Sequence, residues 1–216
     1  MVRNNRDADA KRADKRGFDF IFRPMSHPSN ASTIDPRAYR NTIGAFATGV
    51  TVVAAGHGHH LHAMTANAVT SLSLDPPLLI FCVGKKARIV EVLETAHGFS
   101  VNILRDNQQA LSTYFAGGWK EPVPPPFRFV PWEGGPRLEG CAASIGCALH
   151  KRIEGGDHWI VVGRVVALHQ GEEPQRPLIF YSGKYRHLDA ASVPAPDLEQ
   201  EPPPIQIFYD PWQVDQ

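Results

Sequence analysis

The sequence lacks long apolar runs and an excess of either charge. Its longest apolar stretches, such as residues 78–83, fall far short of the roughly 20 residues that a membrane-spanning helix needs. Its 22 basic residues equal its 22 acidic residues, so the formal charge is zero and gives no electrostatic basis for binding nucleic acid or an anionic membrane. Both deficits predict a soluble cytoplasmic protein without nucleic-acid or membrane partners.

Cysteine is scarce as well. Cys82, Cys141 and Cys147 are odd in number and show no Cys-x-x-Cys spacing, which argues against a disulfide framework or a zinc knuckle. They are expected to be buried thiols, with Cys82 inside its apolar run. A secretory signal is not expected, because residues 1–16 are charged where such a signal is apolar.

The domain organisation follows from length and local composition. With 216 residues, 43% of them hydrophobic, the chain can bury one sizeable core, which we place in residues 33–190. Residues 1–32 are poor in apolar side chains and are expected to be disordered; Met25 is an alternative start, so it stays open whether residues 1–24 are native. Residues 191–216 are expected to form a proline-rich extended tail whose apolar residues pack on the domain or on a partner subunit.

Short strands outnumber helices in the pattern of apolar residues. Spacings of three and four predict helices over residues 35–47, 87–96 and 106–115. Apolar and β-branched segments predict strands over residues 49–55, 78–83, 99–104, 141–152, 159–170 and 178–181. The Gly-Gly-Asp sequence at 155–157, between two of these strands, indicates a hairpin or a bulge. Residues 119–136 hold too many prolines for regular structure and predict a long loop. Because helices and strands do not alternate, a mainly β, antiparallel Greek-key barrel is favoured over a doubly wound sheet.

The most informative stretch is residues 63–86. Small hydroxyl and amide side chains precede the uncharged strand predicted at residues 78–83. That strand is followed by a glycine, Lys85 and Lys86. Uncharged donors and acceptors suit a heteroaromatic ring, whereas exposed N–H groups and lysines suit phosphate. The segment predicts a planar polar ligand with its anionic end near the lysines. A Thr/Ser-rich edge strand with a turn is the alternative.

Two other patterns limit the function. No Gly-x-Gly-x-x-Gly stands between a strand and a helix, so a nicotinamide nucleotide is not expected in a Rossmann site. A glycine-containing hairpin loop carries His57, His59, His60 and His62, but no carboxylate or cysteine lies nearby in the sequence. We therefore expect a solvated turn there and no metal site.

Five further blocks stand out beside residues 63–86. They are Ile-Asp-Pro-Arg (34–37), Phe-Ala-Thr-Gly-Val-Thr-Val-Val (46–53), Phe-Ser-Val-Asn-Ile-Leu (99–104), Gly-Gly-Asp-His (155–158) and Tyr-Ser-Gly-Lys-Tyr (181–185). Together with residues 63–86, these blocks resemble the flavin reductase-like family. The resemblance covers about residues 34–188 in one consistent order. It implies an FMN-binding split β-barrel, usually a homodimer with flavin sites near the subunit interface.

The resemblance also implies a function. The protein would be an NAD(P)H:flavin oxidoreductase that reduces FMN or FAD by hydride transfer from nicotinamide C4 to flavin N5 and supplies reduced flavin to a separate oxygenase, by analogy an aromatic-compound hydroxylase. A non-enzymatic flavin-binding or electron-carrier protein and a related split-barrel flavin oxidase stay open as alternatives. The choice between FMN and FAD, the choice between NADH and NADPH, the tightness of flavin binding and the client oxygenase are also open.

Carried over by position, the resemblance implies a set of site residues. Flavin-ring contacts would come from Thr65, Ala66, Asn67, Ala68 and Val69, with Ser71 and Ser73 behind them and Thr48, Gly49 and Val50 on the adjoining strand. Phosphate contacts would come from Lys85, Lys86, Ala87 and Arg88, and contacts to the ring or ribityl chain from Asn102 and Ile103. Ala68 departs from the serine common at that place in the family, which removes one expected hydroxyl.

The Gly-Gly-Asp-His block is implied to meet the nicotinamide nucleotide. His158, next to Asp157, is the candidate catalytic residue, and Tyr181 and Tyr185 would close the pocket. The structural alternatives are a histidine that merely caps a hairpin and tyrosines that belong to the core.

Overall fold

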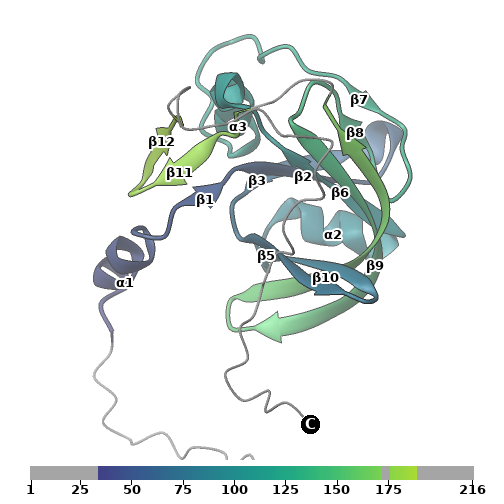
Figure 1. Cartoon of the computed structure of the whole chain (residues 1–216), viewed down its shortest axis with the longest axis horizontal. Helices are drawn as coiled ribbons and strands as arrows, with labels where there is room; N and C mark the ends of the chain where they lie inside the picture. The colour runs from purple at the N-terminus through teal and green to yellow at the C-terminus, as the bar shows by residue number, and fades with distance from the viewer. Residues whose placement is uncertain (1–33, 172–175, 189–216) are drawn as a thin grey trace, which may run out of the picture. The chain divides into compact units, whose positions relative to one another are not determined.

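The computed structural model describes residues 34–171 and 176–188 (Figure 1). The expected disordered extension and the expected proline-rich tail lie outside the described residues. Within them, the helices are α1 (Pro36–Ile43), α2 (Arg88–Thr95) and α3 (Gln109–Phe115), with short 3-10 turns η1 (Gly58–His60) and η2 (Asp106–Gln108). No helix among the described residues is long and apolar enough to cross a membrane.

A seven-stranded sheet contains most of the strands, and every neighbouring pair in it is antiparallel. Its order is β3 (His62–Ala66), β2 (Thr51–Ala55), β6 (Gly98–Ile103), β9 (Ala143–Gly155), β10 (His158–Gln170), β5 (Pro77–Gly84) and β4 (Val69–Leu74). Two small sheets join β1 (Thr48–Gly49) to β11 (Ile179–Tyr181) and β12 (Lys184–Arg186), and β7 (Phe129–Val130) to β8 (Arg137–Leu138).

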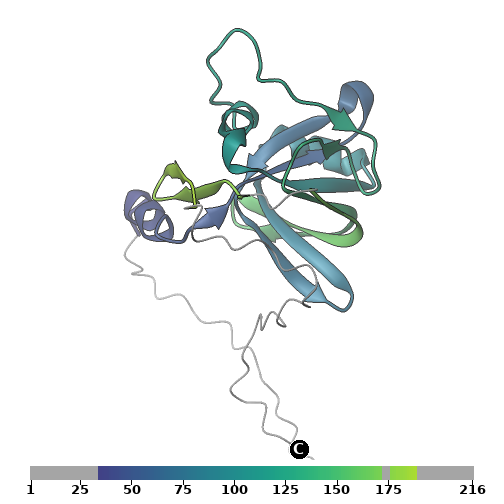
Figure 2. The same cartoon turned by 45° about the horizontal axis from the view of Figure 1, so that its top comes forward.

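The sheet has to curl, because its two edge strands are neighbours in the chain. Only Asn67 and Ala68 separate β3 from β4, and this link can span about 11 Å at most. In a flat sheet, six strand intervals would hold the edges about 29 Å apart. Figures 1 and 2 show the strongly bent strands that result. The sheet therefore forms a barrel that is split between β3 and β4.

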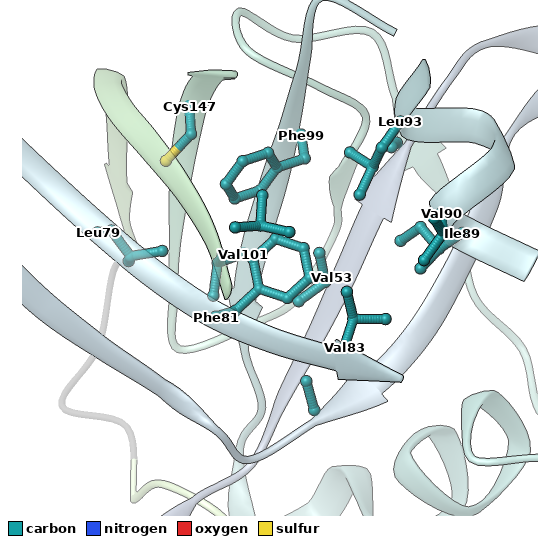
Figure 3. Packing of buried hydrophobic residues seen from close by; sticks show 13 residues of the cluster. Val53, Leu79, Phe81, Val83, Ile89, Val90, Leu93, Phe99, Val101 and Cys147 are labelled. Carbon is teal, nitrogen blue, oxygen red and sulfur yellow. The ribbon is translucent and has the colours of Figure 1, made fainter. Parts of the chain in front are cut away.

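The main core fills the inside of this curled sheet. Phe81 of β5 and Phe99 of β6 meet edge to face, with ring centroids 4.9 Å apart. Helix α2 adds Ile89, Val90 and Leu93 from one face (Figure 3). Since each fully buried side chain of this size contributes roughly 1.5–3 kcal/mol, burial of this face fixes α2, and with it the segment that follows β5.

A strap of chain, residues 131–136 between β7 and β8, crosses the outer face of the sheet at β6 and β9. A Cβ on Gly98 would lie 2.2 Å from the Gly134 carbonyl oxygen, and one on Gly146 would lie 2.1 Å from the Glu133 carbonyl oxygen. Such close approach of backbones is possible only without side chains. The strap covers β6 from outside, so that both faces of this strand are buried.

Helix α1 departs from the expectation for an amphipathic helix. It ends at Ile43, short of the predicted residue 47, where the chain tightens into bonds that span three residues: the Ala45 N–H donates to the Thr42 carbonyl and the Phe46 N–H to the Ile43 carbonyl. None of its residues is buried. Tyr39 is 60% exposed, Ile43 53% and the nearby Phe46 71%. The apolar face is present, but it has no core to pack on among the described residues.

The other local expectations hold with shifted ends. Helix α2 and strands β5, β6, β9, β10 and β11 lie where the sequence predicts them, and the loop over residues 119–136 is mostly irregular. Its aromatic side chains pack on α3, with the rings of Phe127 and Phe115 5.1 Å apart. Cys141 and Cys147 are buried, whereas the expectation of burial is wrong for Cys82, which is half-buried because alternate residues of β5 face outward.

Candidate functional site

The candidate site is a rim where three segments meet at the split of the barrel. They are the β3–β4 link at Asn67 and Ala68, the end of β5, and the tip of the β9–β10 hairpin. Ala68 accepts a hydrogen bond from the N–H of Cys82 at 2.9 Å, and Gly84, two residues further along β5, lies opposite His158. From Cys82 to Gly84 the strand advances about 7 Å, so the β3–β4 link and the hairpin tip lie close together along one edge of the sheet.

Glycine shapes the hairpin tip. Only Gly156 and Asp157 separate β9 from β10, and Gly156 has a φ of +66°. A two-residue hairpin loop needs such a left-handed conformation at its first central position, and glycine adopts it without strain. The hairpin predicted from the Gly-Gly-Asp sequence is thereby confirmed, and it places Asp157 and His158 at its exposed end.

The imidazole of His158 is oriented by its neighbour. Its Nδ1 lies 2.7 Å from Oδ1 of Asp157. Because a carboxylate only accepts, Nδ1 carries the proton, which leaves Nε2 of the neutral ring as an acceptor. The hydrogen bond from His158, followed by its charge when protonated, lowers the pKa of the Asp157 carboxyl. A Cβ added to Gly84 would lie 3.8 Å from Nε2, so the ring sits beside the end of β5.

Lys85 ties the end of β5 to the hairpin. Its backbone N–H donates to the Asp157 carbonyl at 3.0 Å, and its ammonium forms an ion pair with Glu154. The same ammonium lies 5.2 Å from the ring centroid of Trp159, and the guanidinium of Arg152 lies 4.8 Å from it. The hydrogen bond from Lys85, followed by its charge, lowers the pKa of Glu154. Lys85 is thus engaged with protein, whereas Lys86 is exposed.

Three members of this cluster are not predicted from the sequence: Arg152, Glu154 and Trp159. A usable signal was present, since a two-residue turn at 156–157 pairs Glu154 with Trp159 across the hairpin. Register extended from the predicted turn would therefore have found this pair.

The hydroxyl and amide residues near the link fall into two groups. Asn67 is exposed and donates to the hydroxyl of Thr48 at 3.3 Å, so both polar side chains lie at the rim. Thr65 instead donates to the Ser112 carbonyl at 2.7 Å, and the Ser112 hydroxyl lies 2.9 Å from that of Tyr185. Thr65 and Tyr185 thereby join β3 and β12 to α3, which the sequence did not predict.

Asn102 requires a correction. The resemblance implies a contact between Asn102 and the ring or the ribityl chain, but the side chain of Asn102 is completely buried. Its amide nitrogen donates to the Val52 carbonyl at 3.0 Å and to Ser100 Oγ at 2.9 Å. Its oxygen accepts from the Leu138 N–H at 3.0 Å and from Ser144 Oγ at 2.9 Å. With four protein partners, this amide has no hydrogen bond left for a ligand.

The remaining expected contacts are spread along the strands. Val50 and Ala66 are buried, and Ile103 is half-buried. The backbone of Val50 is also engaged, because its N–H donates to the Leu178 carbonyl and its carbonyl accepts from the Leu104 N–H. Val69, half-buried, and Ser71, exposed, continue the rim along β4. Ser73 lies four residues beyond Val69, about 13 Å along the strand, and donates to the Asp75 carbonyl. Gly49 and Tyr181 are exposed; a Cβ on Gly49 would meet nothing within 4 Å.

The beginning of α2 completes the rim. Its N-cap is Ala87, which supplies no side-chain hydrogen bond to the first turn, and Arg88 is exposed as the first helical residue. The free N–H groups of a first helical turn, together with cations, suit phosphate oxygens. The exposed amide and hydroxyls at the link suit the carbonyl and nitrogen atoms of an isoalloxazine. The residues present therefore fit a flavin nucleotide.

Comparison with known proteins identifies relatives over most of the chain. Residues 43–189 match the family model described as "Flavin reductase like domain". The reductase component of 4-hydroxyphenylacetate 3-monooxygenase from Thermus thermophilus is 43% identical over 151 residues, which are 70% of this chain and 95% of that protein. Reductase subunit HsaB of a flavin-dependent monooxygenase from Rhodococcus jostii is 37% identical over 78% of this chain and 88% of its own.

Solved structures agree with the sequence relatives. The flavin reductase PheA2 superposes with a TM-score of 0.67 and 38% identity over 72% of this chain and 99% of its own. The NADH:FAD oxidoreductase SgcE6 of Streptomyces globisporus superposes with a TM-score of 0.65 and 34% identity over 75% of this chain and 99% of its own. These neighbours confirm the split-barrel fold. On the extent of the family match and on these identities, the chain belongs to the flavin reductase-like family.

Proposed function

We propose that the protein is an NADH-dependent flavin reductase that supplies reduced flavin to a separate oxygenase. The observation that carries the proposal is the shared rim, where exposed polar groups of the β3–β4 link, the first turn of α2 and His158 lie along one edge of the split barrel. Relatives named as reductase components of monooxygenases support the role, and relatives named as NADH-dependent FAD and flavin reductases support the choice of nucleotide.

The reaction asks for orientation more than for acid–base chemistry. A bound flavin would supply the hydride acceptor, N5, and the reduced nicotinamide would supply the hydride from C4. The protein's task is to hold the two rings in contact. Asn67 and Thr48 would fix the ring edge, and Lys86, Arg88 and the first turn of α2 would hold the phosphate.

His158 would position the nicotinamide nucleotide. Asp157 holds Nδ1, so Nε2 is the ring nitrogen that is left for the nucleotide. The pairing of Lys85 with Asp157 and Glu154 keeps the hairpin tip against β5, so the imidazole stays at the rim. No side chain has to transfer a proton during hydride transfer.

Steady-state oxidation of NADH with added FMN or FAD tests the proposal. We expect His158→Ala to raise the KM for NADH roughly tenfold with little change in the KM for flavin, because one binding contact of about 1.4 kcal/mol is lost. His150→Ala removes another exposed histidine of the same hairpin and should change neither constant. A protein that binds flavin but oxidises neither NADH nor NADPH would refute the reductase and favour a flavin carrier.

We also propose that the chain works as a homodimer. The support is the apolar face of α1, which residues 34–171 and 176–188 leave uncovered: Tyr39, Ile43 and the neighbouring Phe46 are all more than half exposed. Light scattering after size exclusion should give a dimer for the natural chain and for Val123→Glu, which alters an exposed loop residue, and a monomer for Ile43→Glu. A natural chain that is monomeric would contradict the dimer.

A further inference from the structure

A hollow lies on the far side of α2 from the main core. It measures about 1200 Å³, more than the 300–1,000 Å³ of most ligand pockets. Its walls are the histidine-rich loop at η1, one face of α2, and the strap that follows β7. In both Figure 1 and Figure 2, the η1 turn, in blue, lies beside β7. Nothing in the flavin proposal uses this hollow apart from Arg88.

Arg88 connects the hollow to the candidate flavin site. It is the first residue of α2, directly after the segment proposed for phosphate, and it lines the hollow. It also lies near His62, whose pKa is lowered first by burial and then by the charge of Arg88. A phosphate at the start of α2 would therefore stand at the mouth of the hollow.

The wall along α2 changes character with distance from Arg88. Glu91 follows one turn later, and Val92 and Thr95 line the next turn. From Arg88 to Thr95 the helix rises about 10 Å, comparable with the length of an adenosine monophosphate. Carboxylates such as Glu91 commonly accept hydrogen bonds from ribose hydroxyls. The order along the helix is thus cation, carboxylate and apolar surface.

The opposite wall supplies flat side chains. Trp132 belongs to the strap and is half-buried, and the histidines of the loop and Glu133 line the same hollow. Indole and imidazole rings stack on nucleobases. A metal is a poorer candidate, since the described residues hold no group of three histidine, cysteine or acidic side chains placed to bind one.

We propose that this hollow binds the adenylate group of a dinucleotide, with the phosphate at Arg88, the ribose at Glu91 and the adenine against Trp132. The proposal rests on the flavin reductase function. Two substrates carry this group, because FAD has an adenylate that FMN lacks, and NADH has one as well. The hollow would thereby decide whether the adenylated flavin is preferred or how the nicotinamide nucleotide is held.

Calorimetric titration with AMP alone tests the pocket without any turnover. We expect AMP to bind the natural chain and to bind Trp132→Ala about tenfold more weakly, because stacking of one base on an aromatic ring is worth about 1–3 kcal/mol. Trp132→Phe keeps an aromatic plane and should retain most of the affinity. Glu91→Gln should weaken AMP binding, whereas Glu94→Gln, on the same helix but outside the hollow, should not.

Kinetics then separate the two sources of the adenylate. If it belongs to FAD, Trp132→Ala raises the KM for FAD about tenfold and leaves those for FMN and NADH unchanged. If it belongs to NADH, the same variant raises the KM for NADH with either flavin. Failure of AMP to bind, or equal binding to the natural chain and Trp132→Ala, overturns the adenylate pocket. A chain that reduces no flavin but binds AMP as described would refute the reductase function alone.

Discussion

Replacing Asn102 by alanine should destabilise the protein more than any surface change. The substitution removes four hydrogen bonds of 2.9–3.0 Å in a completely buried site. It leaves the Val52 carbonyl, the Leu138 N–H and the Ser144 hydroxyl without this partner. At a net value of about 1 kcal/mol for each bond, the loss is roughly 4 kcal/mol. Domains of this kind have only about 5–15 kcal/mol of stability in total, so the fraction lost is large.

Denaturant unfolding followed by circular dichroism measures this loss. Asn67→Ala is the matched control, because Asn67 is exposed and its bond to Thr48 is long at 3.3 Å. The control should lose less than about 0.5 kcal/mol of unfolding free energy but raise the KM for flavin. Asn102→Ala with a loss below about 1 kcal/mol, or an equal loss in both variants, would refute the structural role of Asn102.

Asn102→Asp keeps the shape of the side chain but removes its donor. One carboxylate oxygen would face the Val52 carbonyl at the present 3.0 Å separation. Burial and this repulsion should raise the pKa of the new carboxyl above its unfolded value. The folded state then binds the proton more tightly, so unfolding free energy should increase as pH falls and decrease as pH rises. Denaturant unfolding at pH 5 and at pH 8 measures this dependence, and the variant should have the larger unfolding free energy at pH 5.

Three further changes have defined outcomes. Gly163→Ala should lower the unfolding free energy by about 1–3 kcal/mol, because the new Cβ would lie 2.5 Å from Phe99 Cζ. Gly49→Ala is the control; its Cβ would have nothing within 4 Å, so it should be nearly neutral in the same denaturant assay. Burial raises the pKa of Cys147 to about 12, so its thiol ionises at lower pH in the unfolded chain than in the folded one. The unfolding free energy should therefore fall as pH rises above about 9, and Cys147→Ala should make this dependence on pH weaker in unfolding curves. Lys85→Gln breaks a partly exposed ion pair and should cost under about 1 kcal/mol in thermal unfolding, yet raise the KM for NADH by loosening the hairpin tip.

Sequence patterns predicted the elements whose conformation depends on residues close together in the chain. The apolar spacing of residues 87–96 found α2 because one face of this helix is buried in the main core. The Gly-Gly-Asp sequence found the turn between β9 and β10 because that turn needs a positive φ at Gly156. Both signals depend on a few neighbouring residues, which the sequence contains in full.

The candidate site was predicted in composition but only partly in geometry. Asn67 and Asn102 are both amides near strand ends, and one is exposed whereas the other is buried. The alternation of side chains between the two faces of a strand could not distinguish these two amides. Residues 133–136 of the strap cover the outer face of β6, so the whole strand is buried. That contact joins segments more than 30 residues apart in sequence, and it leaves no periodic signal.

The central position of the β9–β10 hairpin sets the order in which the sheet can assemble. β9 pairs with β6 and β10 pairs with β5, so the hairpin joins β3-β2-β6 to β5-β4. During synthesis, β3-β2-β6 and β5-β4 therefore remain separate, with unpaired strand edges, until the ribosome has released the chain to about residue 170. The hairpin is the most local of the long pairings, so it is expected to form quickly and to act as the template on which both groups assemble. Nascent chains stalled before residue 143 should therefore stay sensitive to protease, whereas chains released beyond residue 170 should become resistant in one cooperative step.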